Sequence, residues 1–186
     1  MKSESPSQEN PSGDLIAELV HRVIQALLKR KQTVSFAESC TGGQLSAWIT
    51  ERPGVSVIYK GLVVSYSNEA KVEILGVGLT SLQSQGAVSQ VVAQEMAQGV
   101  RHRFHTDWGI SITGIAGPTG GSAEKPVGTV CLGISGPSLA KAAGEETTDT
   151  FLETRQYLFK GDRNQIQEQS VRTALELLLE ALTKQN

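Results

Sequence analysis

The sequence has 186 residues, enough for one domain with a proper core and too few for two comfortable ones. Hydrophobic residues make up 39% and charged residues 19%, and the net charge of -2 gives no overall attraction to nucleic acid or to an anionic membrane. Only two cysteines occur, far apart in the sequence, which argues against a disulfide framework and against a zinc site. No apolar run is long enough for a membrane span or a signal peptide. We therefore expect a cytoplasmic protein.

The first third of the chain begins with a polar lead-in. Residues 1–13 have almost nothing to bury, so we predict a disordered segment there, followed by a single domain over residues 14–184. Apolar residues at helical spacing predict an amphipathic helix at 14–31, with basic residues at its carboxyl end. A short buried strand at 33–37 breaks at a polar, glycine-containing turn, and the next predicted helix is 44–50.

The middle of the chain is predicted to contain strands followed by helices. Residues 55–66 are rich in valine, isoleucine, leucine and tyrosine and predict one or two strands. A short helix is expected at 68–75, ended by Gly76, and Ser89 is a suitable N-cap for a long helix at 90–104.

The last third predicts the rest of an α/β sheet. Its elements, in order, are a strand at 108–115, a glycine-rich loop at 117–126, a strand at 127–135, a polar surface loop at 136–150 and a strand at 151–159. Asp162 should cap a final amphipathic helix that ends at residue 182. Because no helix separates the last two strands, we expect them to be antiparallel, and the sheet to be mixed.

The turn after the first strand is the first candidate site. Its sequence is Glu38-Ser39-Cys40-Thr41-Gly42-Gly43. A strand–turn–helix geometry aims backbone N–H groups at a ligand and exposes a serine hydroxyl, so Ser39 is a candidate nucleophile. The simpler interpretation is that Ser39 or Thr41 is an N-cap. Cys40 is a rival nucleophile, although a small buried thiol is its more common role, and the three histidines are poorly placed for a serine–histidine–aspartate triad.

A second candidate lies where a strand enters the helix at 68–75. Lys71 falls in about the first turn, where a cation is electrostatically unfavourable, and burial would lower its pKa further. A lysine amine of that kind can take the Ser39 proton without a histidine, and Tyr66 could relay a proton or orient the amine. The alternative is a solvated surface lysine and a core tyrosine.

The third candidate is the glycine-rich loop that leaves the strand at 108–115. Ligands in α/β sheets commonly bind at such strand ends, and loop N–H groups can wrap a phosphate, with Lys125 adding charge. Arg163, at the start of the last helix, could clamp the same phosphate. The loop is neither a Walker A nor a Rossmann fingerprint. A plain flexible loop and an exposed first-turn arginine remain the alternatives.

Several motifs in the same order together resemble the nicotinamide-nucleotide amidase family, also known as the CinA C-terminal domain. They lie at residues 37–43, 66–71, 86–89, 114–118, 125–130 and 161–163, and the resemblance covers about residues 14–184. It implies a three-layer α/β/α sandwich around a mixed, mostly parallel sheet. It also implies an enzyme that needs no metal and no cofactor, and it makes a homodimer plausible.

The activity implied by the resemblance is hydrolysis of the carboxamide of nicotinamide mononucleotide to nicotinate mononucleotide and ammonia, within pyridine-nucleotide recycling. Ser39 would be the nucleophile and Lys71 its base, with Tyr66 close by, while N–H groups at the helix start hold the oxyanion and the glycine-rich loop holds the phosphate. The substrate-binding residues expected on this basis are Glu38, Thr41, Gly42, Gly43, Thr113, Gly114, Gly117, Gly120, Lys125 and Arg163.

Other functions remain open from the sequence. A non-catalytic nucleotide-binding module could retain the pocket without turnover, and an amidase could act on another phosphorylated or ribosylated amide. The family often has an arginine where this chain has Gln167, so a contribution of that position to phosphate binding is in doubt.

Overall fold

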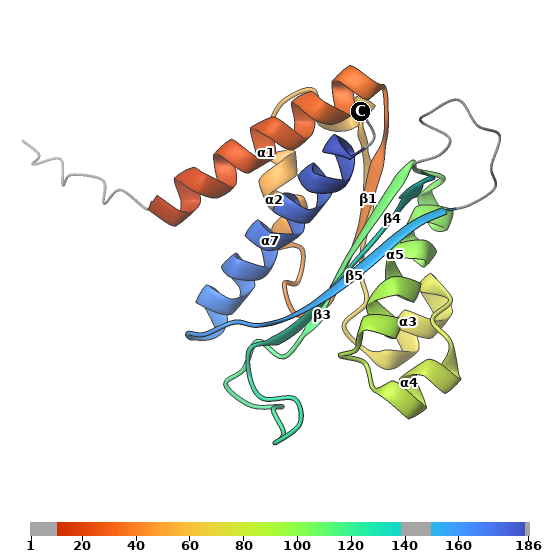
Figure 1. The fold of residues 1–186 in the computed structure, drawn as a ribbon, viewed down its shortest axis with the longest axis vertical. Helices are drawn as coiled ribbons and strands as arrows, with labels where there is room; N and C mark the ends of the chain where they lie inside the picture. The colour runs from red at the N-terminus through yellow and green to blue at the C-terminus, as the bar shows by residue number, and fades with distance from the viewer. Residues whose placement is uncertain (1–10, 139–149, 185–186) are drawn as a thin grey trace, which may run out of the picture.

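The computed structural model describes residues 11–138 and 150–184 and arranges them in three layers (Figure 1). Most of the predicted disordered segment and most of the predicted loop at 136–150 lie outside the described residues. The described strands are β1 (Val34–Glu38), β2 (Tyr59–Val64), β3 (Trp108–Gly114), β4 (Thr129–Pro137) and β5 (Thr150–Leu158). The α/β fold with a mixed sheet, predicted from the sequence, is confirmed.

The sheet has the strand order β2-β1-β3-β4-β5. Strand β1 is parallel to both β2 and β3, whereas β4 is antiparallel to β3 and to β5. Four strands therefore run in one direction and β4 runs against them, and the β4–β5 pair is antiparallel as predicted. Glu38, the last residue of β1, lies opposite Val64 of β2 and Ile112 of β3, so these three strands reach one edge of the sheet at the same level.

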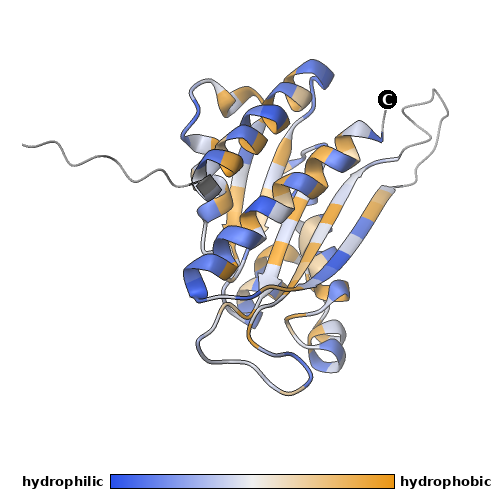
Figure 2. Cartoon of the chain, turned by 60° about the vertical axis from the view of Figure 1, so that its left-hand side comes forward, coloured by the Kyte–Doolittle hydropathy of each residue, from blue (hydrophilic) through white to orange (hydrophobic). Residues whose placement is uncertain are grey.

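Helices cover both faces of this sheet (Figure 1). One layer holds α1 (Pro11–Arg30), α2 (Gln44–Thr50) and α7 (Arg163–Thr183), and the other holds α3 (Asn68–Leu75), α4 (Leu79–Gln85) and α5 (Gln90–Phe104). Because both faces are covered, every residue of β1 and almost every residue of β3 and β4 is buried. Figure 2 shows the apolar strands behind helices that carry polar residues outward. None of the described helices is long and apolar enough to cross a bilayer.

Some segments differ from the prediction. Helix α1 begins at Pro11, so residues 11–13, which were predicted to be disordered, are helical. Residues Val55–Val57 form a 3-10 turn, and strand β2 begins only at Tyr59. Helix α4 was not predicted, because its seven residues, LTSLQSQ, are too few to show a helical period and its N-cap, Gly78, offers no capping side chain. By contrast, the predicted caps are confirmed at Gly76, at Ser89, which accepts from the Val92 N–H, and at Asp162, which forms a full capping box with Gln165.

Candidate active site

The candidate site lies at the edge of the sheet where β1, β2 and β3 end together. Ser39 follows β1, and its N–H donates to the carbonyl of Ile112 on β3 at 3.0 Å. Ser65 follows β2, and its N–H donates to the carbonyl of Glu38 at 2.9 Å. These two bonds extend the parallel sheet by one residue and fix the positions of both serines.

Lys71 lies directly beside Ser39. Its Nζ atom is 3.1 Å from the Oγ atom of Ser39 and donates to the carbonyl of Ser65 at 2.6 Å. The side chain is only 1% exposed, so the alternative of a solvated surface lysine is wrong. Helix α3 delivers it there because the Ser67 side chain caps the helix by accepting from the Ala70 N–H at 3.1 Å.

The electrostatics at Lys71 favour the uncharged amine more than water does. Burial lowers the pKa of Lys71, because an ammonium group loses its hydration in this position. Among the ion pairs of the described residues, none brings a carboxylate to this lysine. A neutral amine can donate one N–H to the Ser65 carbonyl and accept the Ser39 hydroxyl proton on its lone pair. That is the arrangement of a nucleophile and its general base.

A pocket of about 290 Å³ opens onto this pair. The predicted residues that line it are Ser39, Tyr66, Lys71, Thr113, Gly114, Gly117, Gly120 and Arg163, together with Cys40, Ala87, Val88, Ile115, Ala116 and Thr119. Gly117 has a φ of 78°, and a Cβ there would meet Val127 Cγ1 at 2.5 Å, so the wall of the pocket requires glycine at this position. The structure thus brings all three sequence candidates together.

Arg163 and Tyr66 form part of the pocket rim. Arg163 donates through Nη1 to the carbonyl of Gly117 at 2.8 Å, and its Nη2 is 3.5 Å from the Tyr66 hydroxyl. Tyr66 is 67% exposed, so the alternative of a core tyrosine is wrong. Among the described hydrogen bonds none joins Tyr66 to Lys71, and the group that orients the amine is the carbonyl of Ser65.

Glu38 was expected to bind substrate, but its side chain is fully buried and does not line the pocket. Its carboxylate instead accepts the N–H groups of Gly43 at 2.9 Å, Leu45 at 3.3 Å and Ser46 at 3.0 Å. These are the free amides at the start of α2, which the sequence analysis assigned to an oxyanion. Because the Glu38 carboxylate occupies these N–H groups, they are not available to a ligand.

The turn between Ser39 and α2 supplies other donors. Within the described part of the chain, the N–H groups of Cys40 and Thr41 donate to no backbone carbonyl. The alternative that Ser39 or Thr41 is a helix N-cap is wrong, because the N-cap of α2 is Gly43, which makes no side-chain cap. Of Cys40 and Thr41, Cys40 is the one that lines the pocket, so its N–H is the one that a ligand beside Ser39 can reach.

Several predicted substrate-binding residues do not reach the pocket. Thr41 is 1% exposed, and neither it nor Gly42 or Gly43 lines the pocket. Lys125 donates through Nζ to the carbonyl of Gln85 at 2.6 Å, which ties the glycine-rich loop to the end of α4. This lysine therefore braces the loop rather than lining the pocket.

Cys40, the rival nucleophile, also lines the pocket. It is 5% exposed, and burial raises the pKa of its thiol to about 12. The thiol therefore stays protonated at neutral pH, and a protonated thiol is a poor nucleophile.

Gln167 contributes to the site in a way that the sequence analysis missed. It is buried in α7, and its Nε2 donates to the carbonyl of Cys40 at 2.7 Å, while its Oε1 accepts from Gln44 Nε2 at 2.9 Å. It does not line the pocket, so this position has no direct contact with a ligand there. The only feature of the sequence that could have indicated burial of Gln167 is its place on the apolar side of a long amphipathic helix.

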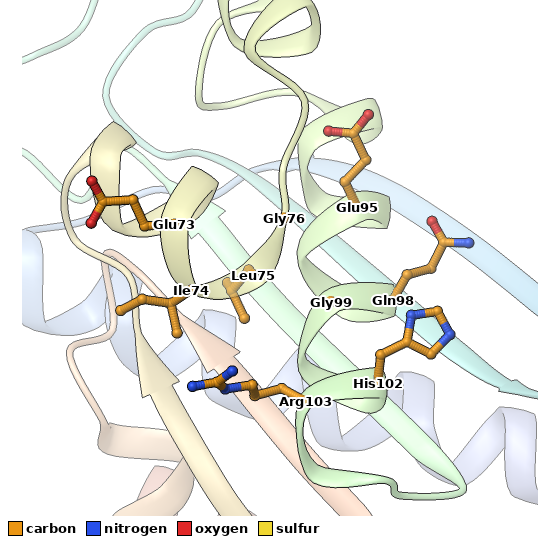
Figure 3. Close-up of a pocket in the computed structure, with 9 residues that line it drawn as sticks. All are labelled: Glu73, Ile74, Leu75, Gly76, Glu95, Gln98, Gly99, His102 and Arg103. Carbon is orange, nitrogen blue, oxygen red and sulfur yellow. The ribbon is translucent and has the colours of Figure 1, made fainter.

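A larger groove of about 590 Å³ lies between α3 and α5 (Figure 3). Its side chains, among them Glu73, His102 and Arg103, spread over an open surface, as Figure 3 shows, and do not converge on one point. Glu95 is already held by the Gly78 N–H and the Ser81 hydroxyl. Across the described residues, no group of three or more histidine, cysteine or acidic side chains is arranged to hold a metal ion.

Comparison with known proteins assigns the chain to a family. The sequence model of the CinA C-terminal domain matches residues 16–182. A CinA-like protein of Fervidobacterium nodosum is 43% identical over 162 residues, which cover 87% of this chain and 37% of that protein. A CinA-like protein of Mycolicibacterium paratuberculosis is 45% identical over 172 residues, which cover 92% of this chain and 37% of that protein. The chain thus spans little more than a third of the length of these relatives.

Solved structures match over the whole domain. The competence/damage inducible protein CihA from Agrobacterium tumefaciens superposes with a TM-score of 0.80 at 37% identity, covering 98% of this chain and 99% of that one. A CinA superfamily protein from Escherichia coli superposes with a TM-score of 0.79 at 31% identity, covering 95% of each chain.

Proposed function

The chain belongs to the CinA C-terminal domain family, and we propose that it is a serine–lysine amidohydrolase that converts nicotinamide mononucleotide to nicotinate mononucleotide and ammonia. One observation carries the proposal: the buried Lys71 amine lies 3.1 Å from the Ser39 hydroxyl at the floor of a glycine-walled pocket. The substrate itself follows from the resemblance of the motifs that line this pocket. At about 290 Å³ the pocket is at the small end of the range for ligand sites, which suits one mononucleotide.

Acylation begins with proton transfer. The Ser39 Oγ attacks the carboxamide carbon while the neutral Lys71 amine takes the hydroxyl proton. The Ser65 carbonyl holds the amine through one N–H, which leaves its lone pair directed at Ser39. The C–O bond forms, and the amide oxygen becomes an oxyanion.

Collapse of the tetrahedral intermediate expels the amine. The N–H group of Cys40, which follows the nucleophile and lines the pocket, is the donor that we assign to the oxyanion. The Lys71 ammonium returns its proton to the departing nitrogen, so ammonia leaves and a nicotinoyl ester of Ser39 remains. Water then attacks this ester, Lys71 takes the water proton, and the Ser39 oxygen departs with that proton, which releases the carboxylate product.

The phosphate end of the substrate requires positive charge and N–H donors. Arg163 lines the pocket and is braced against the Gly117 carbonyl, so its guanidinium is held at the rim. The glycine-rich loop from Gly117 to Gly120 lines the same wall and can bring its backbone close to a ligand. We assign phosphate binding to this side of the pocket.

The test is ammonia release from nicotinamide mononucleotide by the purified protein and by its Ser39→Ala variant. Release by the parent alone supports both the reaction and the nucleophile. Equal release by a correctly folded Ser39→Ala variant overturns the assignment of Ser39. Binding of the nucleotide without release by either protein overturns the proposed catalysis in favour of a binding module, and release from other phosphorylated amides alone would change the substrate.

A further inference from the structure

Gln167 reaches the turn after the nucleophile from the side of α7. Its Nε2 donates to the Cys40 carbonyl at 2.7 Å, and the side chain is only 8% exposed. Because a carbonyl only accepts, the amide nitrogen must face Cys40, and the amide oxygen is left to accept from Gln44 Nε2 at 2.9 Å. The side chain therefore has one defined orientation, fixed from both ends.

The bond that Gln167 makes controls a single peptide plane. The Cys40 carbonyl and the Thr41 N–H belong to the same peptide unit, and in a trans peptide they point in opposite directions. Fixing the carbonyl against α7 therefore also fixes the direction of the Thr41 N–H. Within the described residues, neither this N–H nor that of Cys40 has a backbone carbonyl as its acceptor, and of these two residues Cys40 is the one that lines the pocket.

We propose that Gln167 is a positioning residue: by holding the Cys40 carbonyl it fixes the turn after Ser39, so that the N–H of Cys40, a residue that lines the pocket, is held in place for the developing oxyanion. This inference rests on the proposed function and adds a residue that lies outside the pocket. A preorganised donor stabilises the transition state more than the bound substrate, so its loss lowers kcat and leaves KM almost unchanged.

An arginine introduced at this position would keep the donor and lose the acceptor. A guanidinium is also a planar donor and carries no acceptor, so it can donate to the Cys40 carbonyl but cannot accept from Gln44. The donor to Cys40 is the part of the contact that the proposal requires, and the Gln44 bond only secures its orientation. The Gln167→Arg variant is therefore the informative rescue.

The experiment compares the parent with Gln167→Met, which keeps the size and removes the donor, and with Gln167→Arg, which restores a donor. Gln169→Met is the matched control, because Gln169 lies on the same helix and donates to the Lys160 and Gln165 carbonyls, away from the turn. Each protein is assayed for kcat and KM with nicotinamide mononucleotide, and separately for the rate at which a fluorophosphonate labels Ser39. Thermal unfolding checks that each is folded.

We expect Gln167→Met to lower kcat by about 10-fold to 100-fold, with KM changed less than about threefold, because a displaced donor costs less than the 10²–10³ of a deleted one. Fluorophosphonate labelling should slow in parallel, while Gln167→Arg recovers most of both rates and Gln169→Met matches the parent. A parent-like kcat in Gln167→Met, or a loss that Gln167→Arg does not recover, overturns the positioning role.

Two further outcomes are distinguished. If Gln167→Met does not fold, Gln167→Glu keeps the acceptor for Gln44 and removes the amide donor to Cys40, and an unchanged kcat in that folded variant counts against the role. A parent that neither turns over the nucleotide nor reacts with the fluorophosphonate overturns the proposed function itself.

Discussion

The Lys71 amine and the Ser39 hydroxyl lie 3.1 Å apart, although the residues are 32 positions apart in the sequence. Both are placed by the ends of neighbouring parallel strands: Ser39 follows β1, and α3, which carries Lys71, begins four residues after β2. The level ends of the strands, with Glu38 opposite Val64, bring the turn and the helix start together. The geometry of the proposed nucleophile and base thus depends on the sheet register and on the position of α3.

Replacing Lys71 by methionine should abolish most turnover without harming the fold. Loss of a general base is expected to lower kcat by about 10³-fold. The melting temperature should stay the same or rise, because the variant removes a buried amine that has no carboxylate partner. Ammonia release and thermal unfolding measure the two effects. Lys60→Met, at an exposed lysine that donates to the Ser56 and Val57 carbonyls, is the control and should turn over like the parent.

The activity should depend on pH through the Lys71 amine. Burial lowers its pKa, and the neutral form is the base, so kcat/KM should rise with pH and level off below the ordinary lysine pKa of about 10.4. Between the lowered folded pKa and the unfolded value, the unfolded chain binds more protons, so the free energy of unfolding should also rise with pH in this window. Lys71→Met should lack that component of the rise. A pH–rate profile that stays flat through this window would count against Lys71 as the base.

The sequence predicted the elements that hold the site better than it predicted the contacts inside it. The turn at Ser39, the short helix with Lys71 and the loop after β3 were each placed correctly, because apolar periods, caps and glycines are local signals. Burial of Lys71 was not readable locally, since lysines are usually exposed. It depends on the register between β1 and β2, which is a tertiary property.

The contacts of two polar residues could not be predicted from the sequence. Glu38 was placed with the ligand because it precedes the candidate serine, yet it reaches forward to the start of α2, a contact that follows no standard capping pattern. Gln167 lies 127 positions from Cys40, so nothing local could connect it with the turn. Long-range hydrogen bonds of this kind need the packed structure.

Glu38 should matter for stability more than for substrate affinity. In Glu38→Ala the N–H groups of Gly43, Leu45 and Ser46, which are buried or partly buried, lose their acceptor, and such unsatisfied donors should cost about 3 kcal/mol of unfolding free energy. Denaturant unfolding measures the loss. Glu51→Ala, at an exposed residue at the other end of α2, should change stability little, and equal stability of the two variants would refute the capping role.

The close approach of α5 to α3 offers a way to displace Lys71 without touching it. A Cβ at Gly99 would meet the Leu75 carbonyl oxygen at 1.9 Å, so Gly99→Ala should push α3 away from α5. We expect a loss of about 2 kcal/mol in unfolding free energy from overpacking, together with a lower kcat because α3 carries Lys71. Gly78→Ala is the control, since a Cβ there meets the movable Ser81 Oγ at 3.3 Å and the Glu95 carboxylate oxygens at 3.6 and 3.8 Å, and the backbone is ordinary. If Gly99→Ala is destabilised but turns over like the parent, the idea that catalysis depends on the position of α3 is wrong.

Tyr66 was expected to relay a proton or to orient the Lys71 amine, and its contacts favour a different role. Its hydroxyl lies 3.5 Å from Arg163 Nη2, whereas the Lys71 amine is oriented by the Ser65 carbonyl. Tyr66→Phe removes only that hydroxyl, so kcat should stay within about threefold of the parent, because no step of the proton transfer between Lys71 and Ser39 passes through it. Any effect should appear in KM, through the freedom of Arg163 at the pocket rim. Steady-state assays with nicotinamide mononucleotide decide the matter: a loss of kcat as deep as that of Lys71→Met would restore Tyr66 as a proton relay.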